Sequence, residues 1–283
     1  MQKWIVTQMV LSAALLSAVF VHGQEPAGAE KEKADALTAK RYELMSKRMG
    51  DVKVQSSEEG FPTKLADKPI FRYTDPARSY VAAAVWKIGE EGRPRGLITS
   101  ELHRQFYGKP RIVFEFLSFT PTKFSARSND FNWMPEASAV EFKPVPKADA
   151  PEATPARRLL QMRAIAKRFT GSELVGKEKV ELRLLPQPID RYTPSKAERS
   201  DGSIFLLSFG TNPEAALLIE SDGKAWHYAA GRLAGAQTLT LMIDNELAYE
   251  APPVRYGANS PYTASNAPAD IPGISSDGKE IAE

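Results

Sequence analysis

The stretch Pro69-Ile70-Phe71-Arg72-Tyr73-Thr74 recurs 119 residues later as Pro188-Ile189-Asp190-Arg191-Tyr192-Thr193, with five of six positions identical. A repeat at such a long spacing indicates that one supersecondary unit is used twice. We call these two stretches the Arg-Tyr segments. Further pairs at the same spacing are Trp86 and Phe205, Pro94 and Pro213, and Glu101 and Glu220.

Strand signals follow each Arg-Tyr segment. Runs rich in β-branched and aromatic residues, separated by Gly and Pro, predict antiparallel strands. In the first half of the chain these runs are 81–88, 97–103, 111–119 and 139–145. In the second half they are 179–185, 203–209, 215–220, 224–230, 238–243 and 246–249.

A helix is predicted ahead of each strand series. Residues 37–49 carry apolar side chains at helical spacing. In the second half Thr154 can cap a helix, Pro155 suits its first position, and Gly171 can end it.

Two strand runs indicate how these elements pack. Residues 204–207 and 215–219 are apolar at every position, whereas a half-exposed antiparallel strand alternates. We therefore expect one face of each sheet to be covered by a helix and the other by the second repeat. The predicted fold is α+β, with two tandem repeats of a helix plus an antiparallel β-meander sharing one apolar core. The alternative is a β-sandwich with one flanking helix.

The first 23 residues are typical of a secretory signal peptide. Lys3 supplies the positive start, residues 4–21 are largely apolar, and Val21-His22-Gly23 offers a cleavage site. An uncleaved membrane anchor is less favoured because polar residues interrupt the apolar stretch. We expect a secreted or periplasmic protein with no transmembrane span after cleavage. The predicted boundaries are 24–36 flexible lead-in, 37–145 first repeat, 146–154 Pro/Ala linker, 155–250 second repeat and 251–283 disordered tail.

Composition excludes several classes of protein. The chain has no cysteine, which excludes disulfides, thiolate chemistry and a lipid anchor at the cleavage site. The formal charge of +2 becomes +1 without Lys3, and this balance argues against a nucleic-acid-binding protein.

Motifs for cofactor and metal chemistry are also missing from the sequence. It has no phosphate-binding glycine loop, no Gly-x-Ser-x-Gly elbow and no paired metal-ligand spacing around His103 or His227. We therefore expect neither a cofactor nor a metal, and an enzyme is the less favoured class.

Three residues are weak catalytic candidates. His227 could act as a base with Asp201 or Asp244 to orient it, although a packed or surface histidine is the commoner interpretation. Two more, Asn212 and Glu214, follow Gly210 in a predicted loop and could face a ligand, although turn chemistry explains the segment well.

The predicted helix at 155–171 is strongly basic. Arg157, Arg158 and Arg163 lie on it together with two further basic residues and no acid. Such a face can bind an anionic component of the cell envelope or an acidic protein surface, although a solvated face is commoner. In the Arg-Tyr segments we expect a structural role for the arginines, and packed tyrosines whose hydroxyls are hydrogen-bonded.

A longer pattern in the second half gives a resemblance. The residues that carry it are Leu182-Arg183-Leu184-Leu185-Pro186-Gln187-Pro188, Arg191-Tyr192, Asp201-Gly202 and Gly210-Thr211-Asn212-Pro213-Glu214. This pattern resembles a group of uncharacterised secreted proteins of planctomycete bacteria. The resemblance implies export and a shared fold, and it carries over no activity and no site residues.

The sequence therefore favours an exported, non-enzymatic binding or interaction protein of the periplasm or cell envelope. One alternative is an exported hydrolase that uses His227 with a carboxylate. Another is a carrier of an apolar ligand, because the strands that are apolar on both faces also permit a cavity.

Overall fold

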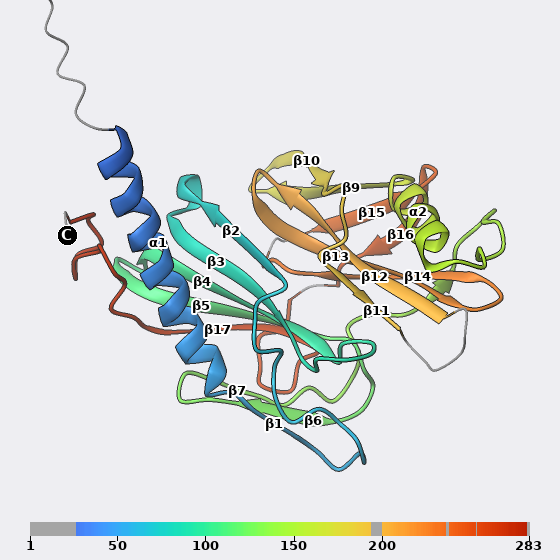
Figure 1. Ribbon diagram of the computed structural model, residues 1–283, viewed down its shortest axis with the longest axis horizontal. Coiled ribbons are helices and arrows are strands. Elements are labelled where there is room, and N and C mark those ends of the chain that lie inside the picture. The colour runs from blue at the N-terminus through green and yellow to red at the C-terminus, as the bar shows by residue number, and fades with distance from the viewer. Residues whose placement is uncertain (1–26, 194–199, 236–237, 253, 282–283) are drawn as a thin grey trace, which may run out of the picture. The chain divides into compact units, whose positions relative to one another are not determined.

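The computed structural model describes residues 27–193, 200–235, 238–252 and 254–281 (Figure 1). The predicted signal peptide, residues 1–23, lies outside them. The chain divides into two compact units, Met1–Ala36 and Leu37–Glu283, and the fold described below is that of the second. Within the described ranges, no helix is long and apolar enough to cross a membrane.

Two α-helices are present in the described chain, α1 (Ala27–Gly50) and α2 (Pro155–Ala166). The predicted flexible lead-in at 24–36 is wrong from Ala27 onward, since the helix already begins there, while residues 24–26 lie outside the described ranges. Alanine, glutamate and lysine, which dominate this stretch, are strong helix formers.

The start of α2 is confirmed and its predicted end is wrong. The Thr154 hydroxyl oxygen accepts a hydrogen bond from the Arg157 N–H, and Pro155 is the first helical residue. The helix ends at Ala166 instead of near Gly171, because the chain continues into strand β9 (Phe169–Val175). A Cβ on Gly171 would lie 2.8 Å from Leu241 Cδ2, so this glycine allows close packing within the sheet.

A five-stranded antiparallel sheet contains the first Arg-Tyr segment. Its strands are β2 (Phe71–Asp75), β3 (Tyr80–Lys87), β4 (Gly96–Phe106), β5 (Lys109–Ser118) and β17 (Tyr262–Pro268), in the order β17-β5-β4-β3-β2. Strand β17 lies in the predicted disordered tail, so that prediction is wrong for these residues. The segment lacks a hydrophobic strand pattern, and its backbone is ordered by hydrogen bonding to the edge of β5.

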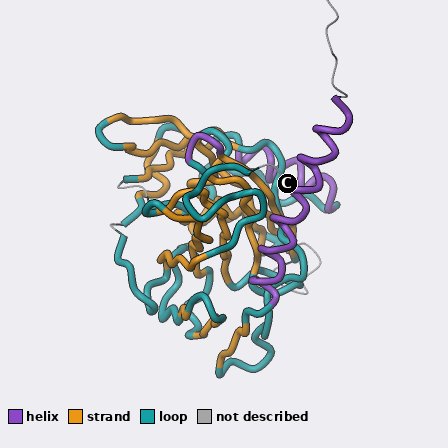
Figure 2. Tube along the Cα trace, turned by 90° about the vertical axis from the view of Figure 1, so that its left-hand side faces the viewer, coloured by secondary structure: helices purple, strands orange, loops and turns teal. Residues whose placement is uncertain are grey.

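Strands make up most of the regular structure, and helices are few (Figure 2). A nine-stranded antiparallel sheet contains the second Arg-Tyr segment. Its path runs β16-β15-β9-β10-β12-β13-β14-β8, and β11 also pairs with β12. Besides β9, its strands are β8 (Lys143–Pro144), β10 (Glu178–Leu184), β11 (Asp190–Tyr192), β12 (Ser200–Phe209), β13 (Asn212–Asp222), β14 (Trp226–Arg232), β15 (Leu239–Ile243) and β16 (Glu246–Glu250).

The remaining elements complete an α+β fold that is mostly β. A short 3-10 helix, η1 (Pro76–Arg78), links β2 to β3. A third antiparallel sheet consists of β1 (Lys53–Ser56), β6 (Phe124–Arg127) and β7 (Asn132–Trp133). The prediction of an α+β fold is confirmed, and among the described residues two helices are present where the sandwich alternative expected one.

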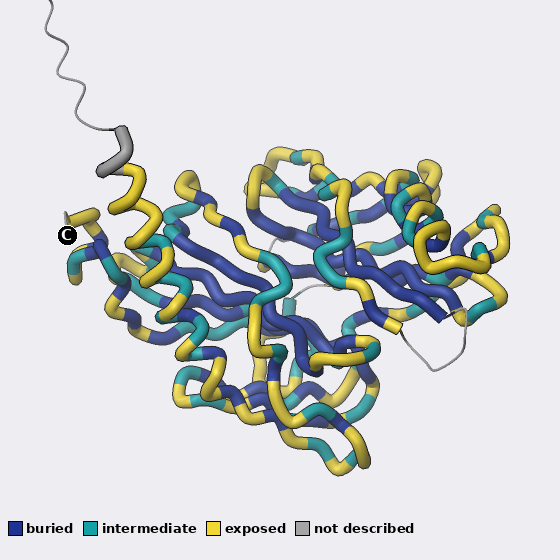
Figure 3. Tube along the Cα trace, in the orientation of Figure 1, coloured by how far each residue is buried: buried dark blue, intermediate teal, exposed yellow. Residues whose placement is uncertain are grey.

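Long stretches of the strands in the two large sheets consist of buried residues (Figure 3). Apolar side chains from both faces of these sheets belong to hydrophobic clusters. On one face of each sheet they pack against a helix: Met45 of α1 belongs to the same cluster as Trp86, and Met162 of α2 to the same cluster as Phe205. On the other face the two sheets pack against each other in a single cluster that includes Val85, Leu97, Ile204 and Leu206. The expectation that both faces are covered, by a helix and by the other sheet, is therefore confirmed.

The two Arg-Tyr segments pair with their neighbouring strands in the same register. Tyr73 lies opposite Ala83, and Tyr192 lies opposite Gly202. The next ladder pairs Ala83 with Glu101 and Gly202 with Glu220. Each residue of the first set corresponds to the residue of the second set that lies 119 positions later, the same spacing as between the two segments.

Candidate functional site

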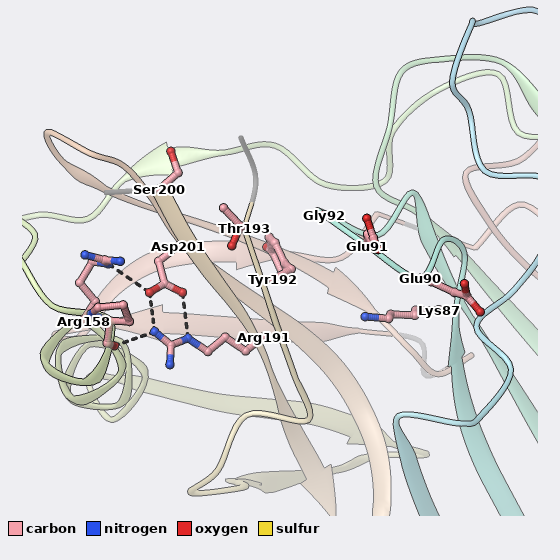
Figure 4. Close-up of a pocket in the computed structure, with 11 residues that line it drawn as sticks. Lys87, Glu90, Glu91, Gly92, Arg158, Arg191, Tyr192, Thr193, Ser200 and Asp201 are labelled. Carbon is pink, nitrogen blue, oxygen red and sulfur yellow. Dashed lines mark hydrogen bonds and ion pairs between the residues drawn. The ribbon is translucent and has the colours of Figure 1, made fainter. Parts of the chain in front are cut away.

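One cavity, of about 850 Å³, is lined by residues of both large sheets and of α2 (Figure 4). Asp201 of β12 accepts hydrogen bonds from Arg158 Nε at 3.0 Å and from Arg191 Nε at 2.9 Å. Across the cavity, Lys87 Nζ lies 2.9 Å from a carboxylate oxygen of Asp190. Each described basic side chain that lines this cavity is therefore already paired with an acid of the protein. Residues 194–199, which follow the lining residue Thr193, are outside the described ranges.

The predicted basic surface of α2 is largely used inside the protein. Arg158 is only 3% exposed and is held by Asp201 and two main-chain carbonyls. Arg163 donates to the Gln187 side chain, whereas Arg157 is exposed. Arg158 therefore binds an acid of the protein itself, Asp201 of β12, and is not part of an exposed basic face. Partner binding through Arg157 and Arg163 stays a prediction.

The structure does not bring the three catalytic candidates together. His227 lies half-buried on β14, opposite Glu220 of β13, and points away from its buried neighbours as expected. Asp201 binds two arginines, and Asp244 accepts a hydrogen bond from Arg168 Nε at 3.1 Å. In the described chain, no hydrogen bond joins His227 to either carboxylate.

A second cavity, of about 360 Å³, is lined from both sheets by the side chains of Glu101, Glu115, Glu173 and Glu214. We call it the glutamate cavity. Arg78, from η1, lines it as well and donates a hydrogen bond to Glu214 Oε1. Because the carboxylates come from strands β4, β5, β9 and β13, only the folded chain brings them together.

Asn212 and Glu214 lie in this cavity, at the start of β13 and not in the predicted loop. The turn is formed instead by Gly210, whose φ is +62°, and by Thr211. Asn212 Nδ2 donates to Glu214 Oε1 at 2.8 Å, and the two residues are 5% and 2% exposed. The sequence thus identified both side chains as possible ligand contacts, and their burial was not foreseen.

Glu173 is the least satisfied acid of the cavity. It is 3% exposed, and Arg78 Nη2 lies 3.7 Å from its Oε1. Within the described residues, neither Glu173 Oε2 nor Asn212 Oδ1 has a hydrogen-bond partner. Burial, followed by the adjacent Glu214 carboxylate, raises the pKa of Glu173 to about 8, although Arg78 and Arg232 act in the opposite direction.

The other two glutamates are hydrogen-bonded. Glu101 accepts from the Tyr73 hydroxyl at 2.7 Å and lies 2.9 Å from His103 Nε2. Glu115 accepts from the Tyr262 hydroxyl at 2.9 Å. Burial, followed by the charge of Glu101, raises the pKa of Glu115 well above its usual value.

Sequence reasoning missed Arg78, Glu115 and Glu173 as functional residues. A usable signal existed for Glu115, because an acid inside the apolar run 112–117 must be buried with a partner or lie at a site. A signal also existed for Glu101, because the repeat has a glutamate at the equivalent position, Glu220. Nothing in the sequence indicated that these acids converge.

The second half has its own tyrosine–glutamate pair, and its surroundings differ. The Tyr192 hydroxyl donates to Glu220 Oε2 at 3.2 Å, just as Tyr73 donates to Glu101. Arg93 binds the Glu220 carboxylate through two N–H groups, with Nε at 2.9 Å. The expectation of packed tyrosines with hydrogen-bonded hydroxyls is confirmed in both halves.

Comparison with models of known protein families, with curated proteins and with solved structures gave no significant match. Within the described residues, no group of three or more His, Asp or Glu side chains is arranged to hold a metal ion.

Proposed function

We propose that this protein is an exported, non-enzymatic binding protein and that its ligand site is the glutamate cavity. The observation that carries this proposal is Glu173, a buried carboxyl group whose Oε2 has no partner in the described chain. A buried polar group without a partner is unfavourable unless a ligand or water satisfies it. The cavity volume also falls within the range of sites for small molecules.

A tandem duplication is the architectural part of this proposal. It is supported by the shared register of the Arg-Tyr segments and by the two tyrosine–glutamate pairs. It is supported further by a reciprocal approach between the sheets. The Thr211 hydroxyl donates to the Thr74 carbonyl, and the backbone at Gly92 lies near the Thr193 carbonyl, where a Cβ would be 3.8 Å from the oxygen. Gly92 precedes Thr211, and Thr74 precedes Thr193, by the repeat spacing, so the two pairs of positions are equivalent.

Equivalent positions after the two hairpin turns place different side chains against the two glutamates. Arg93 and Asn212 are separated by 119 residues, and each is followed by a proline. Arg93 reaches Glu220 in the other half. Asn212 is shorter and neutral, so Glu101, the counterpart of Glu220, has no arginine from the opposite loop.

Export enters the proposal on the strength of the sequence alone, through the signal-peptide features of residues 1–23 and the resemblance to secreted proteins. An anionic or acidic macromolecular partner at α2 is less supported, because Arg158 is buried. A carrier of apolar ligands is also less supported, since charged side chains line the glutamate cavity.

Hydrolysis is the second candidate function, with Glu173 and Glu214 in place of His227. A carboxyl of raised pKa beside one that an arginine binds is an arrangement suited to general acid–base chemistry. A panel of glycoside and ester substrates tests this candidate. If the protein is a hydrolase, it should turn over one of these substrates, and Glu173→Gln should abolish that activity.

The binding proposal is tested by a fragment screen followed by NMR of leucine and valine methyl groups in the purified protein. Ligands that bind as proposed shift the methyl signals of Leu174 and Val175, which line the glutamate cavity, and leave Leu241 in the α2 cluster unmoved. Absence of any ligand that shifts Leu174 and Val175 would contradict the proposal.

A further inference from the structure

We infer that the ligand of the glutamate cavity is an organic cation, a molecule that carries a primary ammonium or guanidinium group on a short apolar stem. This inference rests on the proposed function and specifies the chemical class of the ligand.

The charges that line the cavity are unbalanced. Among the described lining residues, the four glutamates are accompanied by one basic side chain, Arg78. Arg78 donates directly to Glu214 and lies 3.7 Å from Glu173. Glu173 and Glu214 therefore share one cation, and the second negative charge of this buried pair favours a positively charged ligand.

Two oxygen atoms define where the cation would bind. Glu173 Oε2 and Asn212 Oδ1 have no partner among the described residues, and both side chains are more than nine-tenths buried. Asn212 uses its N–H group on Glu214, so its remaining atom is an acceptor. Ammonium and guanidinium groups supply donors only, whereas an anion would meet further acceptors.

The rest of the cavity wall suits carbon atoms. Leu174, Val175 and Ala234 contribute apolar surface to the lining. A volume of about 360 Å³ is far larger than a bare ion needs, and it accommodates a short alkyl stem beside the charged group. Charge and shape together therefore favour an amine or guanidine with a few carbons.

The protonation of Glu173 gives the inference a second observable. Its pKa is raised to about 8 by burial and by Glu214 of β13, while Arg78 of η1 and Arg232 of β14 act against this rise. Glu101 and Glu115 add negative charge from the opposite sheet. Since a cation binds the ionised form better, affinity should increase as the pH rises through about 8.

Isothermal titration of the purified protein with n-butylammonium and n-butylguanidinium tests the inference. The matched ligands are n-butanol, which is neutral, and butyrate, which is anionic. At pH 9 we expect the two cations to bind and the other two not to bind. Glu173→Gln should weaken cation binding at least about tenfold, the effect of losing one charged hydrogen bond. Glu178→Gln, at an exposed glutamate of β10, should leave it unchanged.

The outcomes separate this inference from the function on which it rests. Butanol or butyrate binding that shifts the Leu174 and Val175 methyl signals would overturn the cationic class and leave the binding function standing. Calcium binding that depends on Glu173, without amine binding, would also overturn it. If no ligand of any charge shifts those signals, both proposals fail. If Glu173→Gln does not fold, loss of cation binding between pH 9 and pH 6 in the unmodified protein provides the same test, and unchanged affinity would contradict the inference.

Discussion

The Glu220 end and the Glu101 end of the interface between the two sheets are built alike and differ in what faces the glutamate. Each has a buried tyrosine that donates to the acid across one intervening strand of the sheet. Arg93 binds Glu220, whereas Asn212 leaves the Glu101 end as a cavity. In our proposal, this one difference in side chain leaves Glu101 available to line a ligand site, whereas Glu220 is bound by an arginine.

The arginines of the two Arg-Tyr segments show a second difference. Arg191 binds Asp201, which also holds the buried Arg158. The counterpart of Asp201 in the first half is Ala82, and there the Arg72 guanidinium lies over the Tyr42 ring at 4.4 Å. In both halves the arginine joins the sheet to its helix, as a structural role requires, by an ionic network in one and an aromatic contact in the other.

Removal of Asp201 should have the largest effect on stability. The substitution gives the second half the alanine that the first half has at Ala82, while Arg158 stays in place. Asp201→Ala leaves Arg158 buried without its carboxylate and should lower the free energy of unfolding by about 3 kcal/mol. Chemical denaturation measures this. Glu178→Ala is the control and should have no effect, and an equal loss in both variants would contradict the network.

The next largest effect concerns Glu173 and the pH. Because the pKa of Glu173 is about 8 in the folded state and about 4.5 in the unfolded chain, stability falls as the pH rises between these values. Glu173→Gln should therefore match the unmodified protein near pH 4.5 and be more stable by at least about 2 kcal/mol at pH 9. Denaturation across this pH range tests the difference, and parallel curves would refute it.

Removal of the Arg93 guanidinium from the Glu220 end should have a smaller effect on stability. Arg93→Asn gives the Glu220 end the side chain found at the Glu101 end. Since the Arg93 side chain is 40% exposed, we expect a loss of about 1 kcal/mol, measured by denaturation. Arg93→Lys keeps the charge and should recover part of the loss. If Arg93→Asn is as stable as the unmodified protein, Arg93 does not close that end.

The smallest effect is expected at Arg72. Arg72→Ala removes the contact with the Tyr42 ring and should lower stability by about 0.5 kcal/mol. Arg191→Ala should lower it several-fold more, because it also removes a partner of Asp201. Equal losses measured by thermal denaturation would show that the two halves use their arginines in the same way.

The sequence was informative where local chemistry determines structure. The spacing of the Arg-Tyr segments matched their register, Thr154 capped α2, and the all-apolar runs were covered on both faces. Strand β17 could not be foreseen, since its order depends on the edge of β5 about 150 residues earlier. The glutamate cavity was hidden for the same reason, because its acids lie on four strands and meet only through the packing of two sheets.

The most direct test of the central claim is to fill the glutamate cavity with the side chain that binds Glu220 at the other end, an arginine. Asn212→Arg should fold, and n-butylammonium binding measured by titration at pH 9 should be lost. The control, Gln55→Arg, adds the same charge at an exposed residue of β1 and should retain binding. If Asn212→Arg binds the amine as tightly as the unmodified protein does, the glutamate cavity is not the ligand site.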